Sequence, residues 1–144
     1  MEESLHIVCP HCDTTNRVIS TRLAETPRCG KCKQALFTGR PVELTHSTFQ
    51  KHTENNHIPV LVEFWAPWCG YCQRMAPVFV QAAGRLEPRV RLATVNTQTE
   101  PALAGQFNVS GVPALILFRS GRETARQSGA MDLDTLLAWV RSRI

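Results

Sequence analysis

The sequence lacks the features that would place it in a membrane or on a nucleic acid. No apolar run approaches the roughly 18 residues of a membrane-spanning helix. The N-terminus has neither the basic segment nor the apolar stretch of a secretion signal, so a cytoplasmic protein without a membrane partner is expected. Residues 1–40 hold six Lys/Arg against four Asp/Glu, and residues 41–144 hold ten against eight. Because nucleic-acid binding needs concentrated positive charge, no nucleic-acid partner is expected.

Repeats and low-complexity tracts are also absent. The 144 residues, 43% of them hydrophobic, suffice for one packed domain and a small appendage. Six cysteines in so short a chain could indicate a secreted disulfide scaffold, but that class normally carries an export signal. The cysteines form three Cys-x-x-Cys pairs, whose members are too close along the chain for structural bridges, so metal and redox chemistry explain them better.

The first two pairs have the spacing of a four-cysteine zinc ribbon. Cys9 and Cys12 are followed, after 16 residues, by Cys29 and Cys32. Each turn aims two sulfurs at one point, and two turns complete a tetrahedron around one Zn²⁺ with no position open to a substrate. The site should therefore be structural. Two redox-labile dithiols without metal, or iron in place of zinc, are the alternatives.

Residues 1–40 hold too few large apolar residues for a core of their own. This zinc-binding ribbon-like module should therefore depend on its metal, and metal removal should unfold residues 1–40 only. His11 lies inside the first cysteine turn and is expected to be a bystander. The other histidines show no ligand spacing and are expected on the surface: His6, His46, His52 and His57.

Residues 41–144 have the patterning of an α/β domain, after a Gly/Pro break at residues 38–41. From residue 60 the order β-α-β-α-β-β-α indicates a mixed sheet flanked by helices. The expected elements are a helix over 45–52, a strand over 60–65, a helix over 69–86, a strand over 90–96, a helix over 101–107, a hairpin of strands 115–118 and 123–127, and an amphipathic helix after Asp132.

The third cysteine pair follows the apolar strand and opens the next helix, in the run Trp68-Cys-Gly-Tyr-Cys72. Free N–H groups and the dipole at a helix N-terminus favour a thiolate. Cys69 is expected to be the exposed attacking sulfur and Cys72, one turn deeper, the buried resolving thiol. Gly70 would let the turn close and give a target disulfide access. The alternative, half of another zinc site, lacks a third and a fourth ligand nearby.

Several motifs resemble the thioredoxin family in order and spacing: Val62-Glu-Phe-Trp-Ala-Pro-Trp-Cys-Gly-Tyr-Cys72, Pro77, Gly111-Val-Pro113, Ser120-Gly121 and Gly129-Ala130. The similarity covers about residues 42–144, and the front segment resembles that of the zinc-containing thioredoxin-2 subgroup. The resemblance implies a thioredoxin fold and a protein-disulfide reductase. It also implies disulfide-containing client proteins and a flavoprotein thioredoxin reductase that passes on electrons from NADPH.

The resemblance also implies a substrate-binding rim. The Val112–Pro113 peptide would be cis and face Cys69, and the backbone of Val112 would pair with a bound peptide as an added strand. The residues implied in substrate binding are Trp68, Gly70, Tyr71, Gly111, Val112, Pro113, Gly129 and Ala130.

Three positions depart from the family pattern and bear on redox potential and substrate preference. Tyr71 stands where the reductases usually carry Pro, Glu63 replaces a buried Asp, and Thr94 replaces its Lys partner. Glu63 lies in a strand without a polar face, so burial should raise its pKa and make it a proton acceptor for Cys72. The alternative is a side chain that reaches solvent at an edge of the sheet.

The leading hypothesis is therefore a monomeric thiol–disulfide oxidoreductase that reduces protein disulfides. Gly-Tyr between the cysteines resembles disulfide isomerases, so an isomerase or mild oxidant is the first alternative. A redox-sensing binding module that exposes apolar surface when zinc is lost, and so acts as a holdase, is the second.

Overall fold

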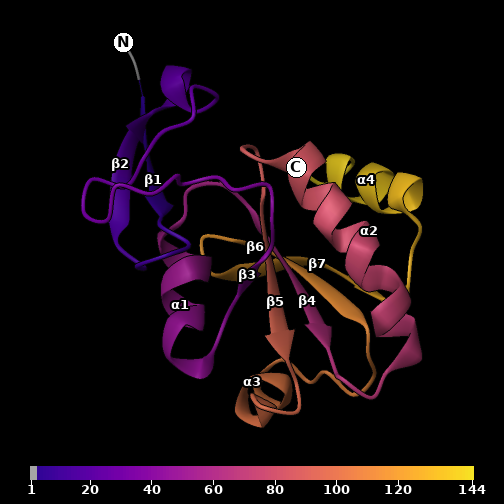
Figure 1. The fold of residues 1–144 in the computed structure, drawn as a ribbon. Helices are drawn as coiled ribbons and strands as arrows, with labels where there is room; N and C mark the ends of the chain where they lie inside the picture. The colour runs from indigo at the N-terminus through magenta and orange to yellow at the C-terminus, as the bar shows by residue number, and fades with distance from the viewer. Residues whose placement is uncertain (1–2) are drawn as a thin grey trace.

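The computed structural model describes residues 3–144 and contains two sheets (Figure 1). The smaller sheet is the antiparallel pair β1 (Ser4–Val8) and β2 (Thr15–Ile19), followed by a short 3₁₀ turn. The larger sheet has, in spatial order, β3 (Val42–Glu43), β5 (Arg91–Asn96), β4 (Val60–Trp65), β6 (Ala114–Arg119) and β7 (Arg122–Ser128). The first three are parallel to one another, and β6 is antiparallel to both of its neighbours, β4 and β7, which confirms the predicted mixed sheet.

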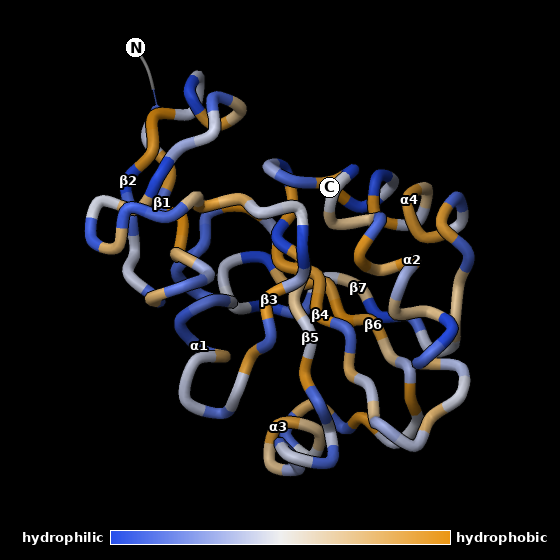
Figure 2. Tube along the Cα trace, viewed as in Figure 1, coloured by the Kyte–Doolittle hydropathy of each residue, from blue (hydrophilic) through white to orange (hydrophobic). Residues whose placement is uncertain are grey.

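Helices cover both faces of the large sheet (Figure 1). They are α1 (His46–Asn55), α2 (Gly70–Leu86), α3 (Pro101–Gln106) and α4 (Leu133–Arg141). Alternate residues of β4 point to opposite faces: Val62 packs with the side chains of α1 and α3, and Leu61 with those of α2 and α4. In Figure 2, hydrophobic colour marks much of the trace of β4 and β6, whose residues are buried on both faces of the sheet.

Two elements differ from the sequence-based expectation. Helix α1 is longer than predicted and reaches Asn55, because Phe49, His52 and Thr53 form a buried face that continues past the expected end. Strand β3 was not predicted, since its two residues are too short for any periodicity to show. Within residues 3–144, none of the helices is both long enough and apolar enough to cross a membrane.

The cysteine-rich front segment packs against α1 and the starts of β4 and β5, at the opposite end of the sheet from the loop between β4 and α2 (Figure 1). Ile58 contributes to the front segment's own apolar cluster. The amide of Val8 donates to Oδ1 of Asn56 at 2.8 Å, and the amide of His57 donates to the carbonyl of His6 at 2.9 Å. The predicted division between residues 40 and 41 stays a prediction.

Arg91, at the start of β5, is the largest fully buried side chain at this interface. Its Nη1 donates to Oε2 of Glu87 at 2.5 Å, and its Nη2 donates to the carbonyls of Leu36 at 2.8 Å and Val8 at 3.3 Å. The guanidinium also lies 4.8 Å over the ring of Phe37. Arg91, which belongs to the large domain, therefore takes two of these three hydrogen-bond acceptors from the front segment.

His52 was expected on the surface, and that expectation is wrong. His52 is 1% exposed, and its Nε2 lies 2.8 Å from Oδ1 of Asp13. Asp13 directly follows the first cysteine turn in the sequence. Burial lowers the pKa of His52, while Asp13 acts in the opposite direction. The other three histidines expected at the surface are exposed: His6, His46 and His57.

Candidate active site and metal centre

The loop between β4 and α2 places Cys69 at the cap of a helix. Cys69 has extended backbone angles, α2 begins at Gly70, and the backbone amide of Cys72 donates to the Cys69 sulfur at 3.1 Å. A helix N-terminus offers N–H groups without intrahelical acceptors, and its dipole favours negative charge. Charge on the Cys69 sulfur is therefore stabilised by the backbone itself.

The Cys69 residue is less open than expected for an attacking sulfur, at 5% exposed, against 3% for Cys72. The neighbouring Trp68 and Tyr71 are 74% and 62% exposed, respectively. Large exposed aromatic side chains next to a recessed sulfur are typical of a docking surface. A target disulfide would reach Cys69 by first lying against this surface.

The Val112–Pro113 peptide is cis and faces Cys69. The Cys69 thiol donates to the carbonyl of Val112 at 3.6 Å, and Val112 packs against the cluster that contains Ala66 and both cysteines. The amide of Gly129, which has φ = 94°, donates to the carbonyl of Pro113 at 2.9 Å. The structure thus brings the loops at 111–113 and 129–130 together beside Cys69.

Two glycines of the predicted rim carry no steric constraint from the rest of the chain. A Cβ added at Gly70 or at Gly111 would meet no atom within 4 Å. The turn at Gly70 therefore closes without needing glycine, contrary to the expected role. What remains at both positions is open space next to the sulfur, which a bound chain can fill.

Glu63 lies on the α2 side of β4 and is 3% exposed, so it does not reach solvent at an edge. Its side chain and that of Cys72 line one cavity of about 250 Å³, and Oε2 of Glu63 has no hydrogen-bond partner within residues 3–144. Burial raises the pKa of Glu63 to about 7. Burial also raises the pKa of Cys72 to about 12, with the Cys69 sulfur and Glu63 acting in the same direction. Thr94 pairs in register with Glu63 and lines the same cavity.

The four cysteines of the front segment converge on one point. Their sulfurs all lie within 4.8 Å of one another, with 3.6 Å between Cys9 and Cys32 and between Cys12 and Cys29. Zn–S bonds of about 2.3 Å give a tetrahedron with edges of about 3.8 Å, close to these separations. The sulfurs therefore fit a tetrahedral, thiophilic ion with little movement.

Hydrogen-bond donors surround one of these sulfurs. The amides of Lys31 and Cys32 donate to the Cys29 sulfur at 3.4 and 3.5 Å, and Nδ2 of Asn16 donates at 3.4 Å. These donors lower the pKa of Cys29 to about 5, whereas burial raises the pKa of Cys9 to about 12. Nε2 of His11 lies 3.1 Å from the carbonyl of Ala35, outside the sulfur cluster.

Protein purified under reducing conditions is expected to hold one zinc ion per chain. Chelation should abolish amide protection in β1 and β2 while β4, β5 and β6 stay protected, because their core does not include the front segment. The melting temperature of the remainder should fall, since Arg91 loses the carbonyls of Val8 and Leu36.

Metal analysis and hydrogen exchange measure both effects. His11→Ala is the matched control and should keep its zinc. Protein without bound metal, or collapse of the whole fold on chelation, would contradict the assignment.

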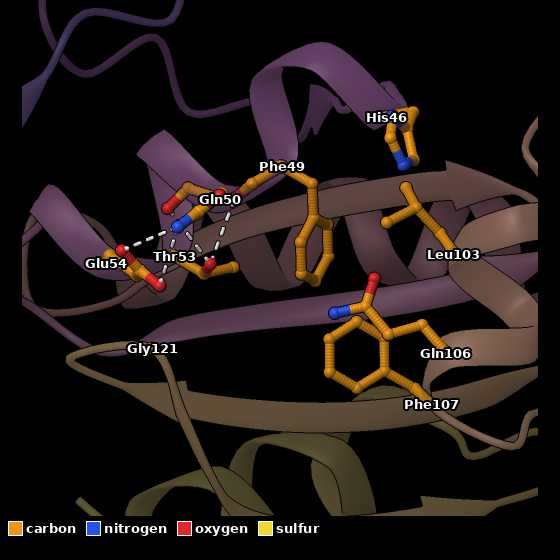
Figure 3. Close-up of a pocket in the computed structure, with 9 residues that line it drawn as sticks. All are labelled: His46, Phe49, Gln50, Thr53, Glu54, Leu103, Gln106, Phe107 and Gly121. Carbon is orange, nitrogen blue, oxygen red and sulfur yellow. Dashed lines mark hydrogen bonds between the residues drawn. The ribbon is translucent and has the colours of Figure 1, made fainter.

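A second cavity of about 300 Å³ lies between α1, α3 and the β6–β7 turn (Figure 3). The rings of Phe49 and Phe107 border it, and Nε2 of Gln50 donates to both carboxylate oxygens of Glu54 at 3.3 Å. None of the predicted site residues lines this cavity. It therefore takes no part in the arrangement around Cys69.

The structure combines a mixed sheet with two thiols at the N-terminus of a helix that follows a central strand. This arrangement is typical of the class of thiol–disulfide oxidoreductases. The family described as "Thioredoxin" matches residues 40–142, and the one described as "Thioredoxin 2, N-terminal" matches residues 8–34. The chain belongs to the thioredoxin family, in its zinc-containing thioredoxin 2 subgroup.

Curated relatives agree with this assignment. The chain is 41% identical to Thioredoxin C-3 of Corynebacterium nephridii over 138 residues, which is 96% of this chain and 94% of the relative. It is 37% identical to Thioredoxin 1 of Nostoc sp. strain PCC 7120 over 94 residues, 65% of this chain and 88% of the relative. The protein is a thiol–disulfide oxidoreductase, and its four-cysteine cluster is a candidate metal site.

Sequence reasoning missed the buried ion pair of Arg91 and Glu87 and the charge of Arg74 beside Tyr71. A signal for Arg91 was present, since it interrupts the apolar run Val90–Val95 much as Glu63 interrupts β4. Glu87 lies only four residues before Arg91, but the other two acceptors, the carbonyls of Val8 and Leu36, lie on distant segments of the chain and could not have been found.

Proposed function

We propose that this protein reduces disulfides in client proteins through Cys69 and Cys72. The observation that carries the proposal is the amide of Cys72 donating to the Cys69 sulfur at 3.1 Å. Of the three cysteine pairs within residues 3–144, this is the one that lies beside the exposed Trp68 and Tyr71 and outside the sulfur cluster. Backbone stabilisation of a sulfur anion is what an attacking thiolate requires.

The reaction proceeds in two exchanges. The Cys69 thiolate attacks one sulfur of the client disulfide, forms a mixed disulfide and releases the other client sulfur as a thiolate. Cys72 then gives its proton to Glu63, and its thiolate attacks the Cys69 sulfur and releases the second client sulfur as a thiolate, which takes up a proton from solvent. Two electrons have passed to the client, and the protein holds a Cys69–Cys72 disulfide. A flavoprotein thioredoxin reductase is proposed to return the dithiol state with electrons from NADPH.

The rim supports this order of attack. Trp68 and Tyr71 are exposed apolar side chains next to Cys69 in the chain, the carbonyl of Val112 lies 3.6 Å from the Cys69 sulfur, and Gly129 is hydrogen-bonded to Pro113. An extended client chain would pair with the backbone of Val112 and present its disulfide to Cys69. Zinc is proposed as the metal of the sulfur cluster, held by Cys9, Cys12, Cys29 and Cys32 in a purely structural role. A reducing compartment, the cytoplasm, suits these free thiols.

The test is reduction of insulin disulfides with NADPH and a thioredoxin reductase. Turnover that disappears in Cys69→Ser and Cys72→Ser but persists in His11→Ala would support the proposal. An isomerase or mild oxidant would instead rescue scrambled ribonuclease and turn over poorly with NADPH. Activity in the double variant Cys69→Ser/Cys72→Ser against thermal aggregation alone would point to a holdase.

A further inference from the structure

Arg74 is an exposed charged side chain that lies against the rim residue Tyr71. On the first turns of α2 its guanidinium carbon lies 4.9 Å from the ring centre of Tyr71, which is 62% exposed. A planar cation over an aromatic face is held by the ring's quadrupole and keeps its hydrogen-bond donors free. Gln73 fixes the same turn to the preceding loop, with its Nε2 donating to the carbonyl of Pro67 at 3.1 Å.

No carboxylate pairs with Arg74 among residues 3–144. The rim segments themselves, residues 67–71, 110–113 and 129–131, contain no charged side chain. The acid nearest to these rim segments along the chain is Asp132, whose Oδ1 accepts the amide of Thr135 at 2.8 Å and caps α4. Arg74 is therefore a rim cation that lacks an internal partner.

We propose that Arg74, held on the Tyr71 ring, selects client disulfides that carry an acidic residue beside the cystine. A carboxylate of the docked chain accepts hydrogen bonds from the guanidinium while its disulfide lies at Cys69. This inference rests on the proposed reductase function and names a class of substrate for it. Arg74 acts as a specificity residue, since it takes no part in the thiol exchange.

The test uses three synthetic peptides with one intramolecular disulfide each, flanked by Asp, by Ser or by Lys. Fully reduced protein is mixed with each peptide in a single turnover, so no reductase is needed. The wild type should react about fivefold faster with the Asp peptide than with the Lys peptide. This factor combines the attraction of Arg74 for Asp and its repulsion of Lys, each on the scale of one exposed ion pair. This preference should fall as salt approaches about 1 M.

Charge variants give the decisive comparison, with all rates expressed relative to the Ser peptide for each variant. Arg74→Gln should bring the Asp-to-Lys ratio close to one, and Arg74→Glu should invert it. Arg85→Gln removes one charge from the other end of the same helix and should keep the wild-type ratio. A ratio that survives in Arg74→Gln, or falls equally in Arg85→Gln, would overturn the inference. Absence of exchange with every peptide would instead contradict the proposed function.

Discussion

Arg91→Ala is expected to lower the free energy of unfolding by about 3–5 kcal/mol, the scale of breaking a buried ion pair by removing one partner. The substitution leaves the carboxylate of Glu87 buried without its cation and removes the donor to the carbonyls of Val8 and Leu36. Burial already raises the pKa of Glu87 while Arg91 lowers it, so loss of the cation should raise that pKa further.

The ion pair of Arg126 and Glu123 offers a matched control. It has a similar distance, 2.7 Å, but both side chains are about one-third exposed. Arg126→Ala should cost no more than about 1 kcal/mol, because exposed pairs are screened by solvent. Urea denaturation of both variants measures the difference. Equal costs would mean that Arg91 does not hold the front segment to the domain.

Glu63→Gln is expected to slow the attack of Cys72 on the mixed disulfide by about 10²–10⁴-fold between about pH 7 and 8, where the wild-type carboxylate, with a pKa of about 7, is at least half ionised and can accept the proton. The substitution keeps the shape of the side chain but removes the base that lines the cavity with Cys72. The effect should shrink at high pH, because hydroxide then competes as a base for a thiol whose pKa is about 12. Rapid-mixing measurement of the second exchange between pH 5 and 10 tests this.

Glu43→Gln, on the exposed residue of β3, is the control and should leave the profile unchanged. An unaltered rate–pH profile in Glu63→Gln would exclude the proton-acceptor role.

Although Glu63→Gln should slow the exchange reaction, it should raise the stability of the folded chain relative to wild type at high pH. The pKa of Glu63 is about 7 in the folded chain, against about 4.3 in an unfolded one. An acid with a raised folded pKa favours the folded state below the unfolded pKa, and this contribution is lost as pH rises through the folded value. Between pH 4 and pH 8 the wild type should therefore lose on the order of 3 kcal/mol relative to Glu63→Gln. Denaturation at several pH values measures this difference. If the free energies of unfolding of the two proteins changed equally with pH across that range, the raised pKa of a buried Glu63 carboxylate would be contradicted.

Local patterns were sufficient to predict most of the elements and the environment of Glu63. The apolar run Val60–Trp65 marked a central strand, and an acid within it was therefore expected to be buried, with a side chain reaching solvent at a sheet edge as the alternative. The spacing of the first four cysteines likewise indicated convergence, which the structure shows at 3.6 Å for two sulfur pairs.

Contacts between distant segments could not be read in this way. His52 has the polar character of a surface residue, and only the docking of the front segment against α1 buries it beside Asp13. The recessed position of Cys69 depends similarly on the loop at Val112, 43 residues further along the chain. Sequence periodicity describes one element at a time, whereas these features arise where two elements meet.

Trapping of the mixed disulfide tests the central claim most directly. Cys72→Ser should accumulate a covalent complex with a client protein, because the first exchange can proceed and the second cannot. Mass spectrometry should place the bond at Cys69, and Cys69→Ser should form no complex. A Cys72→Ser variant that traps no client, or a bond at a cysteine of the sulfur cluster, would contradict the role of Cys69 as the attacking thiol.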